Sequence, residues 1–270
     1  MDNSTKEKLF ITAKKAALKA GEIHLKYYGK EKQIEYKANE FDLVTNADKE
    51  SEEIIINTIK ESFPEHDILA EESQKTELKT DYVWIIDPLD GTTNYAHNFP
   101  QFCVSIAVMY KGEIIVGIVY DAVKKEFFHG IKDEGAWLND KKIEVSSIKE
   151  VSKSLLATGF PYNRTNKETN NFNYFEAFSL KSQAIRRPGS AALDLCYLAC
   201  GRFDGFWELT LAPWDTAAGS LIVKEAGGKV TNFFSDNFDI FIRNIHASNP
   251  YIYDEMQSIL KTTNPNIPII

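Results

Sequence analysis

Two aspartates, Asp87 and Asp90, stand three residues apart in the segment WIIDPLDGTTN, which covers residues 84–94. The apolar run before them predicts a buried strand, and strand ends are where α/β proteins place their sites. Hard cations such as Mg²⁺ prefer carboxylate and carbonyl oxygens. The segment therefore predicts a divalent-cation site to which both carboxylates and the Leu89 carbonyl contribute. Because Asp, Pro and Gly also favour turns, an ordinary surface turn is the alternative.

The spacing of these aspartates argues against two other kinds of site. An EF-hand loop that began at Asp87 would need an acidic residue or Asn at Leu89 and a Glu at Asn98, and neither is present. Haloacid-dehalogenase-type phosphatases also end a strand with paired aspartates, but one residue separates them, whereas two residues separate Asp87 from Asp90. A phosphorylated aspartate is therefore the less favoured alternative for this segment.

A second acidic segment, Glu71 and Glu72, follows a predicted strand over residues 67–70. Glu71 lies sixteen positions before Asp87 (87 − 71 = 16), which allows two neighbouring strands to bring both carboxylates to one edge of a sheet. A surface position is the alternative, and for Glu72 it is the favoured one.

Two more carboxylates and a lysine lie at or before predicted helices. Asp215 is at the start of one helix and Asp48 opens another. Asp is a common N-cap residue, so helix capping is the alternative for both. Lys37 lies eleven residues before Asp48 (48 − 37 = 11) on a polar loop, where a solvated role is the default.

The composition limits the class of protein. The chain has 270 residues, near the upper limit for one hydrophobic core, and a formal net charge of −8. It has no run of five or more Lys or Arg residues, so nucleic acid is not expected as a partner.

The three cysteines, Cys103, Cys196 and Cys200, argue against a disulfide framework and indicate a reducing compartment. Neither a signal-peptide pattern nor an apolar stretch of about 18 residues is present, so we expect a soluble cytoplasmic protein with no membrane partner.

Hydrophobic periodicity predicts alternating groups of helices and strands. The predicted helices cover residues 5–28, 48–63, 170–180, 189–199, 214–226 and 251–260. The predicted strands cover residues 32–36, 67–70, 83–86, 103–110, 113–120, 126–130, 155–160, 184–186, 205–209 and 229–232. A helix pair, an antiparallel meander and a later helix–strand alternation together predict stacked layers of helices and sheets.

Four segments together resemble the inositol monophosphatase family of Mg²⁺-dependent, Li⁺-sensitive phosphatases. They are WIIDPLDGTTN at 84–94, WDTAAGSLIVKEAGG at 214–228, EES at 71–73 and DLVTNAD at 42–48. The resemblance extends from the first helix to about Asn249. It implies an α+β fold, a layered α-β-α-β-α sandwich of the inositol monophosphatase/fructose-1,6-bisphosphatase type. It also implies one domain over residues 1–270, with two subregions of roughly 1–150 and 151–270.

The resemblance implies a metal centre with two or three Mg²⁺ ions, which Mn²⁺ can replace. One ion is expected on Glu71, Asp87 and the Leu89 carbonyl. A second is expected on Asp87, Asp90 and Asp215. A weaker third ion is expected near Glu71.

The resemblance also implies catalytic roles for four residues, which are Asp48, Glu71, Thr92 and Lys37. Thr92 and Asp48 resemble the family's activating pair, in which Asp48 accepts a hydrogen bond from the Thr92 hydroxyl. That hydroxyl would orient the attacking water or take its proton. Lys37 would lie near the third ion and the phosphate.

The implied substrate is a small-molecule phosphomonoester. Its phosphate would face the backbone N–H groups around Gly91, Thr92 and Thr93. Its alcohol portion would meet a second group of residues, which comprises Asp90, Gly189, Ser190, Ala191, Glu208 and Asp215.

Inositol monophosphate is the first expected substrate, and the 2′-phosphate of NADP(H) or a sugar bisphosphate is the second. Arg186 and Arg187 are candidates for a second phosphate, with solvated surface as the alternative. Ala70 stands where the family usually has Gly, and the loop between Glu71 and Trp84 is short, which leaves the substrate open. A homodimer is implied by the resemblance alone. A catalytically silent, metal-dependent binding protein is a further alternative.

Overall fold

The computed structural model describes residues 3–30, 34–36, 43–73, 77–163, 165–166 and 169–263 of the chain. In this part of the chain the helices are α1 (Asn3–Tyr27), α2 (Asn46–Ser62), α3 (Thr92–Ala96), α4 (Phe172–Ser179), α5 (Ala191–Ala199), α6 (Pro213–Glu225) and α7 (Tyr253–Thr263). A 3-10 turn covers Val151–Lys153.

The described strands form two large sheets and one small one. The seven-stranded sheet contains β3 (Asp67–Ala70), β4 (Tyr82–Asp90), β5 (Cys103–Tyr110), β6 (Glu113–Asp121), β7 (Glu126–Ile131), β8 (Gly135–Leu138) and β9 (Lys141–Ile143), in that order. The five-stranded sheet has the order β11 (Ala184–Arg186), β10 (Leu155–Thr158), β12 (Gly205–Leu209), β14 (Asn244–Ser248) and β13 (Lys229–Thr231). A two-stranded sheet pairs β1 (Ile34–Tyr36) with β2 (Leu43–Thr45). In the seven-stranded sheet β3 and β4 are parallel, and the rest is the predicted antiparallel meander.

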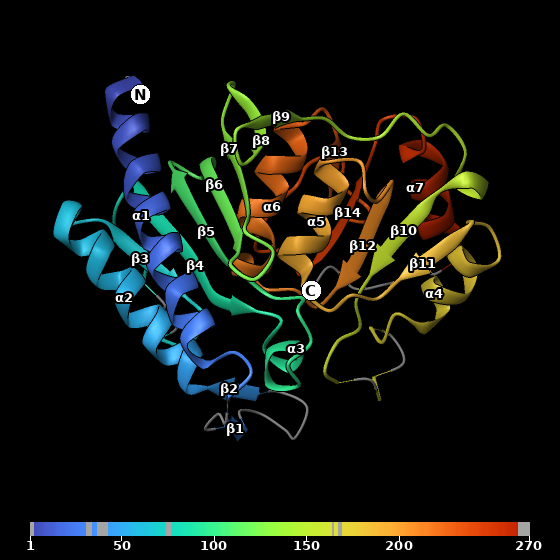
Figure 1. Ribbon diagram of the computed structural model, residues 1–270. Coiled ribbons are helices and arrows are strands. Elements are labelled where there is room, and N and C mark those ends of the chain that lie inside the picture. Colours follow the sequence, from blue (N-terminus) through green and yellow to red (C-terminus); the bar gives the residue numbers. More distant parts are fainter. Residues whose placement is uncertain are drawn as a thin grey trace.

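Five layers follow one another across the molecule (Figure 1). Helices α1 and α2 cover one face of the seven-stranded sheet, α5 and α6 lie between the two large sheets, and α4 and α7 cover the outer face of the five-stranded sheet. This α-β-α-β-α order confirms the predicted fold class. The two large sheets fall on either side of residue 150 in the sequence. The assignment of one domain with subregions 1–150 and 151–270 stays a prediction.

Strand β4 is buried on both faces. Trp84 and Ile86 belong to the apolar cluster beneath α1 and α2, whereas Val83 and Ile85 belong to the cluster around α5 and α6. Double-sided burial explains why the sequence shows a continuous apolar run here rather than an alternation. The carboxylates that follow this run are therefore attached to a firmly packed strand.

Strand β4 is longer than the predicted strand over 83–86, because it continues past Pro88 to Asp90. Asp87 pairs with Ser105 and Asp90 pairs with Cys103, so three steps on β4 face two steps on β5. The extra residue forms a bulge around Pro88, which has no N–H to donate to a neighbouring strand. In a regular strand, side chains three residues apart point to opposite faces. The bulge corrects this alternation and allows Asp87 and Asp90 to serve one cavity.

Each predicted helix starts within two residues of the observed one, and the difference matters for the two helices that present Asp48 and Asp215. Helix α2 has Thr45 as its N-cap, so Asp48 is the third helical residue, and its Oδ2 accepts the N–H of Thr45 at 2.8 Å. Helix α6 begins at Pro213, whose fixed φ suits the first helical position. The N–H of Ala212 donates to Asp215 Oδ2 at 2.6 Å. Each aspartate therefore caps its helix from within the first turn, which uses one carboxylate oxygen.

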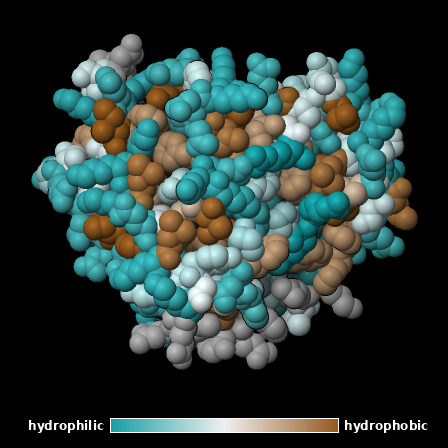
Figure 2. All heavy atoms as spheres, in the orientation of Figure 1, coloured by the Kyte–Doolittle hydropathy of each residue, from teal (hydrophilic) through white to brown (hydrophobic). Residues whose placement is uncertain are grey.

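Hydrophilic residues dominate the face of the molecule shown in Figure 2, and hydrophobic residues are scattered among them. Scattered apolar residues are normal on protein surfaces. Of the described helices, none combines the length and the apolar character that crossing a lipid bilayer requires.

Candidate active site

One cavity of about 280 Å³ gathers most of the predicted site residues. The predicted residues that line it are Glu71, Asp87, Leu89, Asp90, Gly91, Thr92, Thr93, Gly189, Ser190, Ala191, Glu208 and Asp215. Three helices, α3, α5 and α6, begin at its wall. Segments as far apart as Glu71 and Asp215 (215 − 71 = 144 residues) thus meet at one place.

Parallel pairing of β3 and β4 places Glu71 beside Asp87. Ala70 pairs with Ile86, and the N–H of Glu71 donates to the Ile86 carbonyl at 3.2 Å. Both strands therefore deliver a carboxylate to the same edge of the sheet, as the spacing of Glu71 and Asp87 predicts.

Backbone N–H groups fix two of the carboxylates through one oxygen each. The N–H of Leu89 donates to Asp87 Oδ1 at 2.9 Å, and the N–H of Ala212 donates to Asp215 Oδ2. These bonds set the orientation of each carboxylate and do not occupy its second oxygen.

Asp90 is held by the start of α5. Its Oδ2 accepts the Ser190 hydroxyl at 2.6 Å and the N–H of Ala192 at 2.8 Å. Ser190 is the N-cap of α5, so the helix that presents the predicted substrate loop also anchors a predicted metal ligand.

Burial raises the pKa of three of these carboxyl groups, and the neighbouring acidic groups add to the effect. The pKa of Asp90 rises to about 6, although the hydrogen bonds from Ser190 and Ala192 oppose the shift. The pKa values of Asp87 and Asp215 lie well above the ordinary Asp value. The nearby Glu71 carboxyl group is one of the causes that raise the pKa of Asp87. Without cations the cluster therefore retains protons, and a bound cation would displace them.

The chemistry of the donors fits a hard cation. Among the described lining residues none is His or Cys, and the acidic ones offer only oxygen. No three acidic, His or Cys side chains in the described chain form one compact metal-binding group. Mg²⁺ accepts such oxygen ligands and usually keeps several waters of its own.

Thr92 links the cavity to a buried aspartate behind it. Its hydroxyl lies 3.1 Å from Asp48 Oδ1 and 3.0 Å from the Leu89 carbonyl oxygen. Asp48 is fully buried, and this burial raises its pKa to about 6 even though two hydrogen bonds from Thr45 favour the charged form. Asp48 is not a lining residue, and its hydrogen bond with Thr92 connects it to the cavity.

Two residues of the 84–94 segment shape the backbone beside the cavity. Gly91 has a φ of +94°, and a Cβ there would lie 2.8 Å from the Gln101 carbonyl oxygen, so only glycine fits. Asn94 Nδ2 lies within hydrogen-bond distance of the carbonyl oxygens of Gln101 (2.7 Å), Pro188 (2.9 Å) and Gly189 (3.2 Å). Asn94 thereby ties the loop before α5 to α3. No role was predicted for Asn94, because two of its partners, Pro188 and Gly189, are distant in sequence.

A further part of the cavity lining consists of Glu208, in β12, and residues 159–162. Burial raises the pKa of Glu208 to about 8, with the Asp215 charge adding and Arg187 opposing. Arg187 and Arg243 also line the cavity, and Arg243 donates to the Thr210 carbonyl at 2.9 Å. Arg243 was not among the predicted site residues, because it lies in a stretch with no predicted element.

The remaining singled-out residues are of two kinds, those outside the described part of the chain and those that are described but do not line the cavity. Lys37 lies outside the described residues, as does Asp42 at the start of the 42–48 segment. Arg186, at the end of β11, and Glu72 are not lining residues. For Glu72 this agrees with its favoured assignment away from the site.

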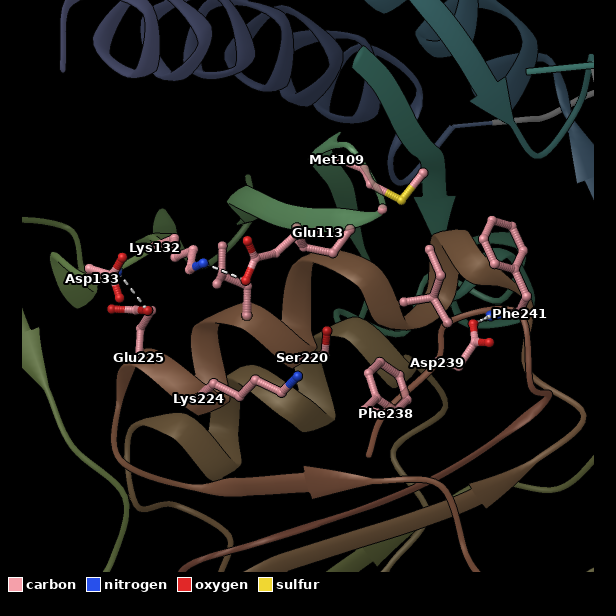
Figure 3. Close-up of a pocket in the computed structure, with 14 residues that line it drawn as sticks. Met109, Glu113, Lys132, Asp133, Ser220, Lys224, Glu225, Phe238, Asp239 and Phe241 are labelled. Carbon is pink, nitrogen blue, oxygen red and sulfur yellow. Dashed lines mark hydrogen bonds and ion pairs between the residues drawn. The ribbon is translucent and has the colours of Figure 1, made fainter. Parts of the chain in front are cut away.

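A larger cavity, of about 570 Å³, is lined by parts of α6, the β5–β6 turn and residues 238–241 (Figure 3). It contains none of the predicted site residues. Lys132 pairs with Glu113 there, and Glu225 accepts the N–H of Asp133 at 2.9 Å. Some of its charged side chains thus already bind each other or the backbone. The larger of the two cavities is therefore not the one that contains the candidate active site.

The sequence matches the model of the "Inositol monophosphatase family" over residues 5–265. It is 44% identical over 252 residues to the inositol-1-monophosphatase of Synechocystis sp., which covers 93% of this chain and 88% of the relative. It is 43% identical over 246 residues to the Nus factor SuhB of Escherichia coli strain K12, which covers 90% of this chain and 92% of the relative.

Solved structures share the fold. The inositol monophosphatase from Anabaena matches with a TM-score of 0.87 and 42% identity, covering 96% of this chain and 97% of that one. An IMPase/NADP phosphatase complexed with Mg²⁺ and phosphate matches with a TM-score of 0.80 and 27% identity, covering 90% of this chain and 91% of that one.

Proposed function

Since the chain belongs to the inositol monophosphatase family, we propose that it is a Mg²⁺-dependent phosphomonoesterase. The observation that carries the proposal is the meeting of Glu71, Asp87, Asp90 and Asp215 in one cavity. Such a cavity repels a phosphate unless cations offset its charge. The related IMPase/NADP phosphatase that is complexed with Mg²⁺ and phosphate supports the same pairing of ion and substrate.

The proposed metal ligands divide into two overlapping sets. Glu71, Asp87 and the Leu89 carbonyl would hold one ion, and Asp87, Asp90 and Asp215 would hold a second. A third ion near Glu71 and the replacement of Mg²⁺ by Mn²⁺ are further parts of the proposal. When bound, the ions would make a water molecule more acidic and offset the charge of the phosphate.

Thr92 and Asp48 would accept the proton of the attacking water. A water beside Thr92 can donate to its hydroxyl while that hydroxyl donates to Asp48 Oδ1. Thr45 donates its N–H and its hydroxyl to Asp48 Oδ2, at 2.8 and 2.6 Å, so the carboxylate cannot easily turn away. The N–H groups around Gly91, Thr92 and Thr93 would face the phosphate. Lys37 stays in the proposal as a cation near the phosphate.

Replacing Thr92 by Val should lower kcat by between roughly tenfold and 10²-fold and change KM little, because the water loses the group that orients it. Valine keeps the shape of the side chain and removes the hydroxyl. Thr92→Ser keeps the hydroxyl and is the matched control, with turnover close to wild type. Steady-state phosphate release at saturating Mg²⁺ measures the effect. Equal kcat for Thr92→Val and wild type would show that the proton takes another route.

Inositol monophosphate is the substrate we propose first. Glu208, Ser190 and the backbone at Gly189 and Ala191 would meet its hydroxyl groups, because they line the same cavity as the proposed metal ligands. The name of the Synechocystis relative, inositol-1-monophosphatase, supports this choice.

A substrate with a second phosphate is the second candidate, favoured by two arginines. Arg187 and Arg243 both line the cavity, and guanidinium groups bind phosphates well. NADP(H) or a sugar bisphosphate would supply the second phosphate. Arg243→Gln should then weaken turnover of the bisphosphate while leaving inositol monophosphate nearly unchanged.

A panel of kcat/KM values tests the function and the substrate together. Inositol 1-phosphate, fructose 1,6-bisphosphate, NADP⁺ and 3′-phosphoadenosine 5′-phosphate are compared with Mg²⁺, with EDTA and with added Li⁺. We expect phosphate release that needs Mg²⁺, is highest for inositol 1-phosphate and is inhibited by Li⁺. No release from any of the four with Mg²⁺ present would contradict the proposal and favour a silent binding protein.

A single-turnover experiment separates water attack from an aspartyl-phosphate intermediate. Acid-quenched enzyme should carry no labelled phosphate on Asp87, because water rather than the carboxylate attacks. Labelled Asp87 would favour the alternative. Homodimerisation is also proposed, from the resemblance alone, and sedimentation velocity would test it.

A further inference from the structure

A buried hydrogen-bond network lies directly behind the wall of the cavity that contains Glu208. Asn171 Nδ2 lies 2.6 Å from the Gly159 carbonyl oxygen and 2.8 Å from Thr158 Oγ1. The Trp207 indole N–H donates to Asn171 Oδ1 at 2.8 Å, and the Thr158 hydroxyl donates to the Trp207 carbonyl at 2.6 Å. Asn171, Thr158 and Trp207 are almost completely buried and do not line the cavity. The network thus fastens the end of β10 to β12 from behind.

The two residues that follow the network in sequence do line the cavity. Gly159 follows Thr158, and Glu208 follows Trp207. A Cβ added to Gly159 would overlap the carboxyl group of Glu208. The Glu208 side chain therefore rests against the Gly159 backbone, and a shift of either residue must move the other.

The backbone of Asn171 supports a positioning role. Asn171 precedes α4 with a φ of +69°, in the left-handed region that few residues other than glycine adopt, Asn being one of them. Its side chain makes no capping bond to that helix, and its contacts instead reach β10 and β12. The conformation is therefore held by the network.

We propose that Asn171 is a positioning residue that sets the alcohol-binding wall, defined as residues 159–162 and Glu208, and so selects polyol phosphates. The inference rests on the proposed function. The proposed metal ligands lie on β4 and α6 or directly after β3, and the hydrogen bonds of the network join β10 and β12 instead. Loss of the network should therefore weaken recognition of the alcohol and spare the reaction at the phosphate.

Asn171→Gly tests the proposal, because glycine tolerates the same φ and removes all the side-chain bonds. We expect kcat/KM for inositol 1-phosphate to fall about tenfold, mainly through KM, since a small displacement of Glu208 disturbs its contacts with hydroxyls. For 4-nitrophenyl phosphate, which has no hydroxyls for Glu208, kcat/KM should stay within about twofold. Thr158→Val should act in the same direction with a smaller effect, and Thr158→Ser should resemble wild type.

Asn249→Ala is the matched control for a general loss of stability. Asn249 is also fully buried, and its Nδ2 donates to Ser146 Oγ at 2.9 Å and to the Ile148 carbonyl at 3.0 Å. None of these residues lines the cavity. The variant should lower the melting temperature and leave the ratio of kcat/KM for the two substrates unchanged.

An NMR spectrum reports on the hydrogen bonds of the network in the absence of substrate. In a ¹⁵N–¹H correlation spectrum the indole N–H of Trp207, assigned with Trp207→Phe, should shift in Asn171→Gly because it loses its acceptor. The indole signals of Trp84 and Trp137, on the seven-stranded sheet, should stay in place.

The results of these experiments distinguish a failure of the positioning role of Asn171 from a failure of the proposed function. A folded, active Asn171→Gly enzyme with an unchanged substrate ratio would overturn the positioning role alone, as would an equal change in Asn249→Ala. If Asn171→Gly fails to fold, the ratio of kcat/KM for the two substrates is measured in Thr158→Val instead, and an unchanged ratio there would overturn the positioning role. A wild-type protein that hydrolyses neither substrate would overturn the proposed function and the substrate selection with it.

Discussion

Replacing Asp87 by Asn is expected to lower kcat by at least ~10²-fold, the loss typical of removing one electrostatic element of a site. Asp87 belongs to both proposed ion sites and lies almost fully buried beside Glu71. Asparagine keeps the shape, and its carbonyl can still accept the Leu89 N–H, so the fold should persist. What disappears is the negative charge that would hold the cations. The loss should therefore appear in turnover and in Mg²⁺ affinity together.

Titration calorimetry with Mg²⁺ and steady-state phosphate release check this expectation. Asp121→Asn is the matched control, because Asp121 is equally buried but accepts its hydrogen bonds from Lys124 and does not line the cavity. Near-normal turnover by Asp87→Asn with Mg²⁺ present would rule out the metal assignment. A comparable loss in Asp121→Asn would point to general destabilisation instead.

The metal-free protein is expected to lose stability as the pH rises from about 4 to about 8, and Mg²⁺ should restore it. The pKa of Asp90 and that of Asp48 are raised to about 6 and that of Glu208 to about 8, chiefly by burial. A group with a raised pKa in the folded state keeps a proton that the unfolded chain has already released. Stability then falls with rising pH between the unfolded pKa, about 4 for these acids, and the folded one.

Melting temperatures of EDTA-treated wild type and Asp215→Asn between pH 4.5 and 8 measure the effect. Asparagine removes one buried acid whose pKa is well above the ordinary value. The melting temperature of the variant should therefore rise relative to that of wild type as the pH rises. At pH 7.5, Mg²⁺ should raise the melting temperature of wild type and have little effect on Asp215→Asn, because ligands stabilise only the state that binds them. Parallel curves for the two proteins would contradict the idea that Asp215 belongs to a repelling cluster.

Local sequence patterns predicted the parts of the candidate site that lie at the ends of two paired strands. Glu71 and Asp87 each follow an apolar run, and parallel pairing of the two runs brings them together. Asp90 was predicted from its type and from the resemblance, but its orientation depends on the bulge in β4. Bulges depend on the neighbouring strand, so the sequence of β4 alone does not specify one.

The elements that were missed lack a local signal for physical reasons. All five residues of β14 are buried, since the strand lies between β12 and β13 inside the sheet. Three of them, Asn244, His246 and Ser248, are polar, so the segment lacks the apolar run that predicts a buried strand. Helix α3 has only five residues, too few for a periodicity to show. Asn94, Asn171 and Arg243 act through partners distant in sequence. Their roles follow only from the assembled fold.

The middle layer has a consequence for synthesis on the ribosome. The strands of the seven-stranded sheet end at Ile143, but the helix that covers their inner face, α6, starts only at Pro213, 70 residues later (213 − 143 = 70). At translation rates of about 5–20 residues per second, this delay lasts for several seconds. During that interval the nascent chain presents an uncovered apolar sheet face, which chaperones recognise and which favours aggregation.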